Sequence, residues 1–219
     1  MNKLKSRSLK QQTPAVRDAE ATKNSILDAA EKEFAVGGLL GARTEAIAAK
    51  TGVTKCMIFY YFGNKEGLYK AVLERGLSDF VRSLQGIDIH SVSPQNALRN
   101  LTEAILNTVE THANLHRILI YENIQNEGKF YGQIAFASVY GPIVEVLKRG
   151  IAAGEFRKLD PIHVAVNIVG LCVQYFGFSH NVKHLWPPGT NPSSKEMVEA
   201  HKREAVEQVV ASVLATDSD

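Results

Sequence analysis

The chain has 219 residues, of which 45% are hydrophobic and 22% are charged, and its formal net charge is +2. This composition is ordinary for a folded globular protein and excludes a generally disordered chain. The two cysteines, Cys56 and Cys172, are far apart in the sequence and form no CxxC motif, so they indicate neither a disulfide framework nor a zinc site.

Charge is unevenly distributed along the chain. Residues 1–75 carry 13 lysines and arginines against 8 acidic residues, whereas residues 76–219 carry 12 against 15. A basic first third suggests a polyanionic partner, although a chance imbalance explains the charge alone equally well. The N-terminus lacks the apolar core of a signal peptide, and the longest uncharged run is interrupted by polar residues. These features predict a cytoplasmic protein that does not enter a membrane.

Helical periodicity dominates the chain from its basic N-terminal arm onward. Thr13-Pro14 predicts the start of the first helix and Gly37-Gly38 its end, because a hydroxyl cap, an N1 proline and a left-handed glycine suit those places. Strand-like alternation is nearly absent, so the predicted fold class is all-α. The predicted helices span about residues 13–36, 44–50 and 54–62, and then 94–111, 114–126, 129–153, 160–183 and 193–215. A fourth predicted helix begins at residues 64–65, carries Leu68, Val72 and Leu77, and continues into the C-terminal domain.

The most specific pattern covers residues 44–62, TEAIAAKTGVTKCMIFYYF. Two short helices crossing around a tight turn need a small residue where they approach, a glycine in the turn, and apolar residues that hold the second helix down. An ordinary helical hairpin needs neither the small residue nor this register. The pattern therefore predicts a helix-turn-helix, carried by Ile47, Ala48, Gly52, Val53 and Ile58.

Residues 26–34, 41–48 and 52–68 resemble the DNA-binding domain of the tetracycline-repressor (TetR) family. The polar and basic composition of the N-terminus predicts a flexible arm over residues 1–19. The resemblance implies a three-helix DNA-binding domain over residues 20–75. A larger helical domain for ligand binding and dimerisation would then cover residues 76–219. The implied assembly is a homodimer.

The resemblance also implies which residues meet a double-stranded DNA operator. Thr44 and Thr54 would cap the second and third helices, and Lys65 would contact a phosphate at the start of the fourth. The first turn of the third helix would face base edges, where Cys56 and Met57 suit a thymine methyl group. The complete set is Arg43, Thr44, Thr54, Lys55, Cys56, Met57, Phe59, Tyr60, Tyr61 and Lys65.

Two residues of this set depart from the family pattern, and three features allow a second interpretation. Phe59 replaces the usual tyrosine, which removes a phosphate-binding hydroxyl, and Cys56 stands where glycine or a polar residue is common. Met57 also fits simple core packing, and Arg43 also fits a merely solvated side chain. The basic arm is interpreted as a solvated tail in preference to a segment that enters the minor groove.

The second half of the chain places polar and aromatic residues on apolar helices, as ligand pockets do, although each aromatic residue alone also fits a core position. Residues 113–127, 150–156 and 171–181 resemble the regulatory domains of TetR-type regulators of pyrimidine and N-heteroaromatic catabolism. That resemblance implies a small planar effector. The predicted ligand-binding residues are Tyr121, Glu122, Phe136, Tyr140, Gln174, Tyr175, Phe178 and Asn181.

The last helices resemble the dimerisation pair of the same family. An apolar stripe on the final helix suits a dimer contact or a contact within one chain equally well. The histidine pairs His112/His116 and His180/His184 have a spacing that can hold a metal, but no third ligand completes either set, so no metal or other cofactor is predicted. The stripe consists of Val198, Ala205, Val206, Val209, Val210 and Val213.

The sequence contains no nucleophile elbow, phosphate loop or metal motif, so no enzyme and no catalytic residue are predicted. The leading hypothesis is a ligand-responsive transcriptional repressor that binds a pseudo-palindromic operator as a dimer and is released by an effector. A DNA-binding architectural protein without an effector and a ligand-dependent activator remain as alternatives.

Overall fold

The computed structural model describes residues 14–131 and 133–215, with side chains from residue 18 onward except those of residues 132–136, 179 and 180. The described part consists of helices, turns and loops, apart from one isolated β-bridge between Phe156 and Leu214. The all-α prediction is therefore confirmed. None of the described helices is long and apolar enough to span a membrane.

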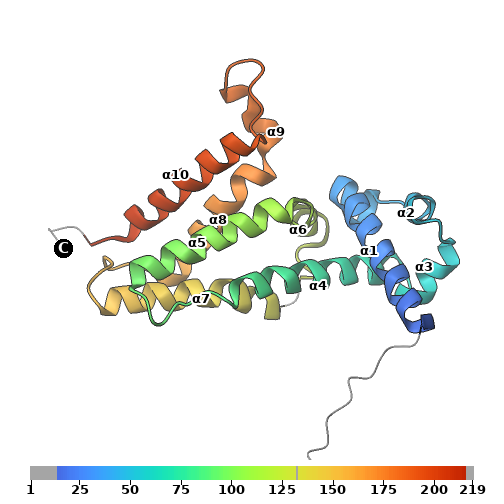
Figure 1. Ribbon diagram of the computed structural model, residues 1–219, viewed down its shortest axis with the longest axis horizontal. Helices are drawn as coiled ribbons and strands as arrows, with labels where there is room; N and C mark the ends of the chain where they lie inside the picture. The colour runs from blue at the N-terminus through green and yellow to red at the C-terminus, as the bar shows by residue number, and fades with distance from the viewer. Residues whose placement is uncertain (1–13, 132, 216–219) are drawn as a thin grey trace, which may run out of the picture.

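The N-terminal helices gather at one end of the molecule, and most of the later helices pack at the other (Figure 1). Between them runs α4 (Lys65–Leu84), which starts where the sequence predicts and continues into the C-terminal part. The helices of the N-terminal end are α1 (Pro14–Gly41), α2 (Thr44–Thr51) and α3 (Lys55–Phe62).

The C-terminal part is a bundle of long helices with a projecting hairpin. α9 (Ser179–Val182) and a 3-10 turn (Lys183–Leu185) form that projection between α8 and α10 (Figure 1). The bundle consists of α5 (Pro94–Thr111), α6 (Ala113–Asn126), α7 (Gln133–Ala152), α8 (Pro161–Gly177) and α10 (Lys195–Val213).

Two hydrophobic clusters hold the chain together, and α4 contributes to both. Its first half places Leu68 and Tyr69 in the N-terminal cluster, and its second half places Phe80 in the C-terminal cluster. α6 also crosses this division, because Leu115 and Ile118 belong to the N-terminal cluster. The N-terminal and C-terminal parts of the molecule are therefore joined by α4 and α6, which both contribute to the N-terminal cluster while extending into the C-terminal part.

Several helix ends differ from the predictions, each for a local reason. Gly38 takes a positive φ of 63°, as expected for a break, but one more helical turn follows and ends at Gly41. α7 starts four residues later than predicted, after a turn at residues 127–130 in which Glu127 and Gly128 take positive φ values of 53° and 77°. α8 ends at Gly177 because Phe178 leaves helical geometry at φ −116° and ψ 17°.

The apolar stripe of α10 lies inside the monomer. Its members are at most 5% exposed, and α10 packs against α5 and α8 of the same chain. Of the two interpretations left open by the sequence, the contact within one chain is therefore the one that the structure contains. A dimer contact has to use other residues.

Candidate nucleic-acid interface and ligand cavity

Short-range contacts fix the geometry of the helix-turn-helix. Gly52 follows α2 in the left-handed region at φ 71°, and its N–H donates to Ala48 O over 3.0 Å. The Thr54 hydroxyl then accepts from Met57 N over 3.2 Å, which caps α3 as predicted. Ile47 and Ile58 are fully buried and anchor α2 and α3 to the N-terminal cluster.

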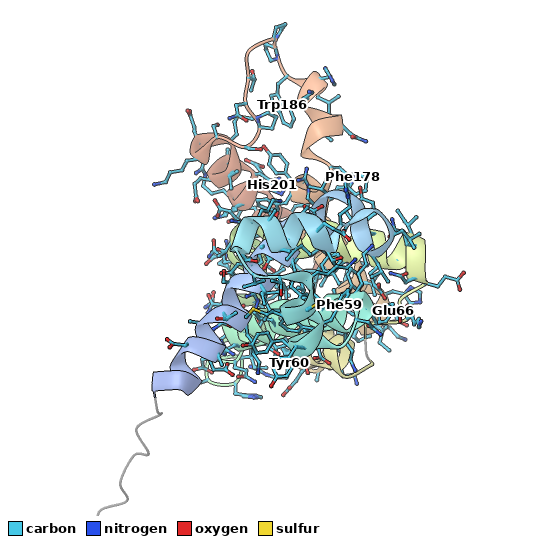
Figure 2. The ribbon with its side chains drawn as sticks, turned by 90° about the vertical axis from the view of Figure 1, so that its right-hand side faces the viewer. Phe59, Tyr60, Glu66, Phe178, Trp186 and His201 are labelled. Carbon is cyan, nitrogen blue, oxygen red and sulfur yellow. The ribbon has the colours of Figure 1, made fainter. Side chains whose placement is uncertain are left out.

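One face of α3 is exposed and does not pack against the hydrophobic core. Tyr60 is 84% exposed, Met57 is 40% exposed, and Lys55 and Cys56 are also exposed. The core-packing interpretation of Met57 is therefore wrong. Figure 2 views this end of the molecule and labels Tyr60 and its neighbour Phe59. Four side chains from two successive helical turns thus form a surface that can enter a groove of DNA.

The flanking residues of this surface are held by the protein. Phe59, Tyr61 and Lys65 are half-buried, and the rings of Phe59 and Tyr61 pack against the N-terminal cluster. The Lys65 ammonium donates to Leu40 O at the end of α1 over 3.2 Å, so one of its three donors is already used. The lysine still lies at the first position of α4, where the helix dipole favours a phosphate.

The start of α2 is capped differently from the prediction. Arg43 is exposed and occupies the N-cap position, while Thr44 is the first helical residue and only 6% exposed. The Thr44 hydroxyl lies 3.5 Å from Glu45 Oε2, so its predicted role as the cap of α2 is wrong. Lys55 pairs with Glu45 Oε1 at 2.6 Å, and this hydrogen bond lowers the pKa of the glutamate.

A cavity of about 550 Å³ lies in the C-terminal part, within the range of cavities that hold drug-sized molecules. It is enclosed by α4, α6, the loop after α6, α7 and α8. Its lining is mainly apolar, and Ile124 and Phe178, which are 71% and 42% exposed, mark where it reaches the surface. The other lining residues are Leu77, Phe80, Leu115, His116, Leu119, Ile120, Glu122, Asn123, Gly128, Tyr131, Val139, Tyr140, Val169 and Val173.

The polar residues of the cavity are kept in uncharged or internally bonded states. Burial lowers the pKa of His116 to about 4, so its imidazole is neutral near pH 7. Burial also raises the pKa of Tyr131 to about 12. Glu122 is only 1% exposed, and its two carboxylate oxygens accept from Phe130 N and Asn126 Nδ2, each over 2.6 Å.

Three of the predicted ligand-binding residues line the cavity: Glu122, Tyr140 and Phe178. Tyr121 instead donates its hydroxyl hydrogen to Val36 O of α1 over 2.9 Å. Tyr175 donates to Pro192 O over 2.7 Å and stacks on the imidazole of His201 at 4.1 Å. These two residues therefore lie outside the lining.

The remaining predicted ligand-binding residues also lie apart from the cavity or outside the description. Gln174 and Asn181 are exposed and do not line the cavity. The side chain of Phe136 falls outside the residues that the structure describes. His116 and Tyr131 line the cavity but were not in the predicted ligand-binding set. A periodic signal for α6 was available, because Leu115, His116, Leu119, Ile120 and Asn123 recur at helical spacing on one face.

The sequence matches two families of known proteins. Residues 26–72 match the family described as bacterial regulatory proteins, tetR family, and residues 94–209 match the tetracyclin repressor-like C-terminal domain. The chain is 31% identical over 171 residues to the HTH-type transcriptional repressor NicS of Pseudomonas putida, an alignment that covers 76% of this chain and 81% of the relative.

Two more distant similarities agree with these matches. The HTH-type transcriptional regulator RutR of Escherichia coli K12 is 25% identical over 169 residues, which cover 76% of this chain and 79% of RutR. A crystal structure of a tetR-family regulatory protein from Rhodococcus RHA1 superposes with a TM-score of 0.74 at 19% identity, covering 90% of this chain and 98% of that one. The structural likeness shows that the whole fold is shared.

Proposed function

The chain belongs to the TetR family of bacterial transcriptional regulators, and we propose that it is a dimeric repressor released from its operator by a ligand in the α4–α8 cavity. It is not an enzyme, because the matched family and the named relatives are transcriptional regulators. The observation that carries the proposal is the pairing of an exposed α3 face with an apolar cavity on the same long helix, α4.

DNA binding is supported by the chemistry of the exposed α3 face. Lys55 and Tyr60 can hydrogen-bond to phosphate oxygens or base edges, while Cys56 and Met57 present apolar surface suited to thymine methyl groups. Lys55 has to exchange its bond with Glu45 for a bond to DNA. Arg43 and Lys65, at the starts of α2 and α4, complete the surface with contacts to the backbone.

A homodimer is supported by the outward face of α8. Ile162 and Val166 lie one helical turn apart and are 66% and 53% exposed, and Gly170 follows after another turn with open space where a side chain would point. Large exposed apolar residues next to a glycine allow two copies of α8 to approach closely. A second chain that packs there would bury this face around a two-fold axis.

The response to a ligand is proposed to pass through α4 and α6 together. Leu77 and Phe80 of α4 line the cavity, and Lys65 at the other end of the same helix lies on the DNA side. A ligand that favours one setting of α4 would move the two recognition helices of the dimer away from the spacing of one DNA turn, about 34–36 Å. The presence of a cavity with polar groups in its lining favours a ligand-responsive regulator over an architectural DNA-binding protein without an effector.

The size of the cavity bears on the effector. Its volume of about 550 Å³ accommodates a planar heteroaromatic molecule with more than one ring or with an apolar substituent. The likeness to NicS and RutR supports a regulator of small-molecule metabolism, and we propose a heteroaromatic compound as the effector on that basis.

Footprinting and paired titrations test the proposal. DNase footprinting upstream of the gene and its neighbours should reveal two symmetric protected patches on a pseudo-palindrome. Among a panel of heteroaromatic compounds, the tightest binder should weaken operator binding, and the operator should weaken its binding by the same factor, about 5–150-fold. Mutual strengthening would make the compound a co-repressor. A single asymmetric patch bound at full affinity by a monomer would contradict the dimeric repressor.

Phe59→Tyr should tighten operator binding by about 0.5–1.5 kcal/mol, because the added hydroxyl supplies one net hydrogen bond to a phosphate. The ring is only half-buried, and its centroid lies 5.6 Å from the ammonium of Lys55 on the exposed face of α3. Fluorescence anisotropy with labelled operator measures the change. Weaker binding by a variant with an unchanged melting temperature would show that the ring edge faces the protein.

A further inference from the structure

The cavity contains no positive charge to receive an anion. None of its lining residues is a lysine or an arginine, and residues 132–136, whose side chains lie outside the description, are Gly-Gln-Ile-Ala-Phe in the sequence. Lys129, in the loop beside the cavity, is directed elsewhere: its ammonium lies 3.8 Å from Glu66 and 4.7 Å from the Phe130 ring centroid. His116 is neutral near pH 7, because burial holds its pKa at about 4.

A carboxylate is built into the same wall. Glu122 is buried, and its oxygens are held by two neutral donors, Phe130 N and Asn126 Nδ2. None of the ion pairs among the described residues involves Glu122, so no cationic side chain among them lies against its carboxylate. Glu122 also affects the neighbouring Tyr69, whose pKa is raised by burial and by the charge of Glu122.

We infer that the cavity discriminates ligands by charge, preferring an aromatic cation, accepting an uncharged aromatic compound, and rejecting aromatic carboxylates. This inference rests on the proposal that the cavity is the effector site. An anion would lose its hydration beside Glu122 without gaining a counter-charge, which is the usual way in which a site excludes a wrong partner. A cation would offset the buried charge of Glu122.

The shape and the aromatic lining of the cavity agree with this ligand class. Phe80, Tyr131, Tyr140 and Phe178 line it from four different segments of the chain. The faces of aromatic rings attract organic cations, most strongly where water is excluded. Apolar residues supply the rest of the wall, so the ligand has to be apolar apart from its charge.

Three ligands on one skeleton test the inference directly: 1-methylquinolinium, quinoline and quinoline-6-carboxylate carry charges of +1, 0 and −1 at pH 7.5. Calorimetric titration of the full chain without DNA should show 1-methylquinolinium binding about tenfold more tightly than quinoline, and the carboxylate at least about tenfold less tightly. Equal affinities, or tighter binding of the carboxylate, would overturn the inference, and this comparison needs no variant.

The Glu122→Gln variant tests whether this one residue is responsible for the discrimination of ligands by charge. The variant keeps an oxygen to accept from Phe130 N, and it should bring the three affinities within about threefold of each other while changing that of quinoline little. Glu127→Gln is the matched control, since it removes an exposed acid that lies at the end of α6 and does not line the cavity, and it should keep the wild-type order. An unchanged charge preference in Glu122→Gln would overturn the role of this carboxylate.

The outcomes separate this inference from the proposed function. Ligands that bind without regard to charge, yet still release the operator, would overturn the charge discrimination alone. If none of the three compounds binds, the cavity is not an aromatic-ligand site and the inference fails, whereas the operator footprint and the dimer are judged by their own measurements. Loss of operator binding with intact charge discrimination would overturn only the proposed repressor.

Discussion

Val166→Glu should convert the protein into a monomer and lower its operator affinity at least about 100-fold, because two linked recognition helices bind much more tightly than one. Val166 is 53% exposed on the outward face of α8, beside Ile162. In a two-fold dimer each copy would bury an unpaired carboxylate at the interface, which is costly. Analytical ultracentrifugation measures the oligomeric state, and fluorescence anisotropy measures operator binding.

Ile124→Glu is the matched control for this substitution. Ile124 is 71% exposed on α6, at the mouth of the cavity and not on the outward face of α8, so the same change in charge and shape should leave the dimer intact. A Val166→Glu protein that remains dimeric and keeps its operator affinity would show that the subunits meet through another surface.

The free energy of unfolding should fall by about 3 kcal/mol as the pH is lowered from 6.5 to 4, through the protonation of His116 alone. Burial in the cavity wall lowers the pKa of this histidine from 6.5 to about 4. The unfolded chain therefore takes up a proton in this pH range before the folded chain does. Stability is fully present above pH 6.5 and is lost as the pH falls through this window.

Urea denaturation at a series of pH values measures this effect. His116→Gln removes the titrating group and should reduce the slope of the profile between pH 4 and 6.5, leaving the contribution of His201, whose pKa burial also lowers. His163→Gln, at an exposed position of α8, should retain the full wild-type slope. A slope unaffected by His116→Gln would mean that the folded protein already accommodates a protonated His116.

Features governed by neighbouring residues were predictable from the sequence. The cap by Thr54 and the turn at Gly52 depend on backbone groups within four residues, and both occur as expected. The break at Gly38 follows from a glycine that tolerates positive φ. Thr44 shows the limit of this reasoning, because a difference of one residue in the start of α2 transfers the N-cap position to Arg43.

Contacts between distant segments decided the ligand cavity and could not be read from local patterns. Tyr121 and Glu122 are neighbours, yet Tyr121 reaches Val36, 85 residues away, while Glu122 faces the loop after α6 and the cavity. Tyr175 is directed to Pro192 and His201 by the packing of α8 against α10. An aromatic residue on an apolar helix therefore indicates burial, but its tertiary partners determine whether it lines a cavity.

The hydrogen bonds between α6 and α1 limit how the DNA-binding part of this regulator can be exchanged with that of another regulator. Tyr121 donates to Val36 O, Gln125 donates to Gly37 O and accepts from Leu40 N, and a side chain at Gly38 would overlap Gln125. A chimeric biosensor joined after residue 75 would exchange α1 while leaving this face of α6 behind. The transferable DNA-binding module is consequently discontinuous: it consists of the N-terminal helices and the matching face of α6, which must be grafted together.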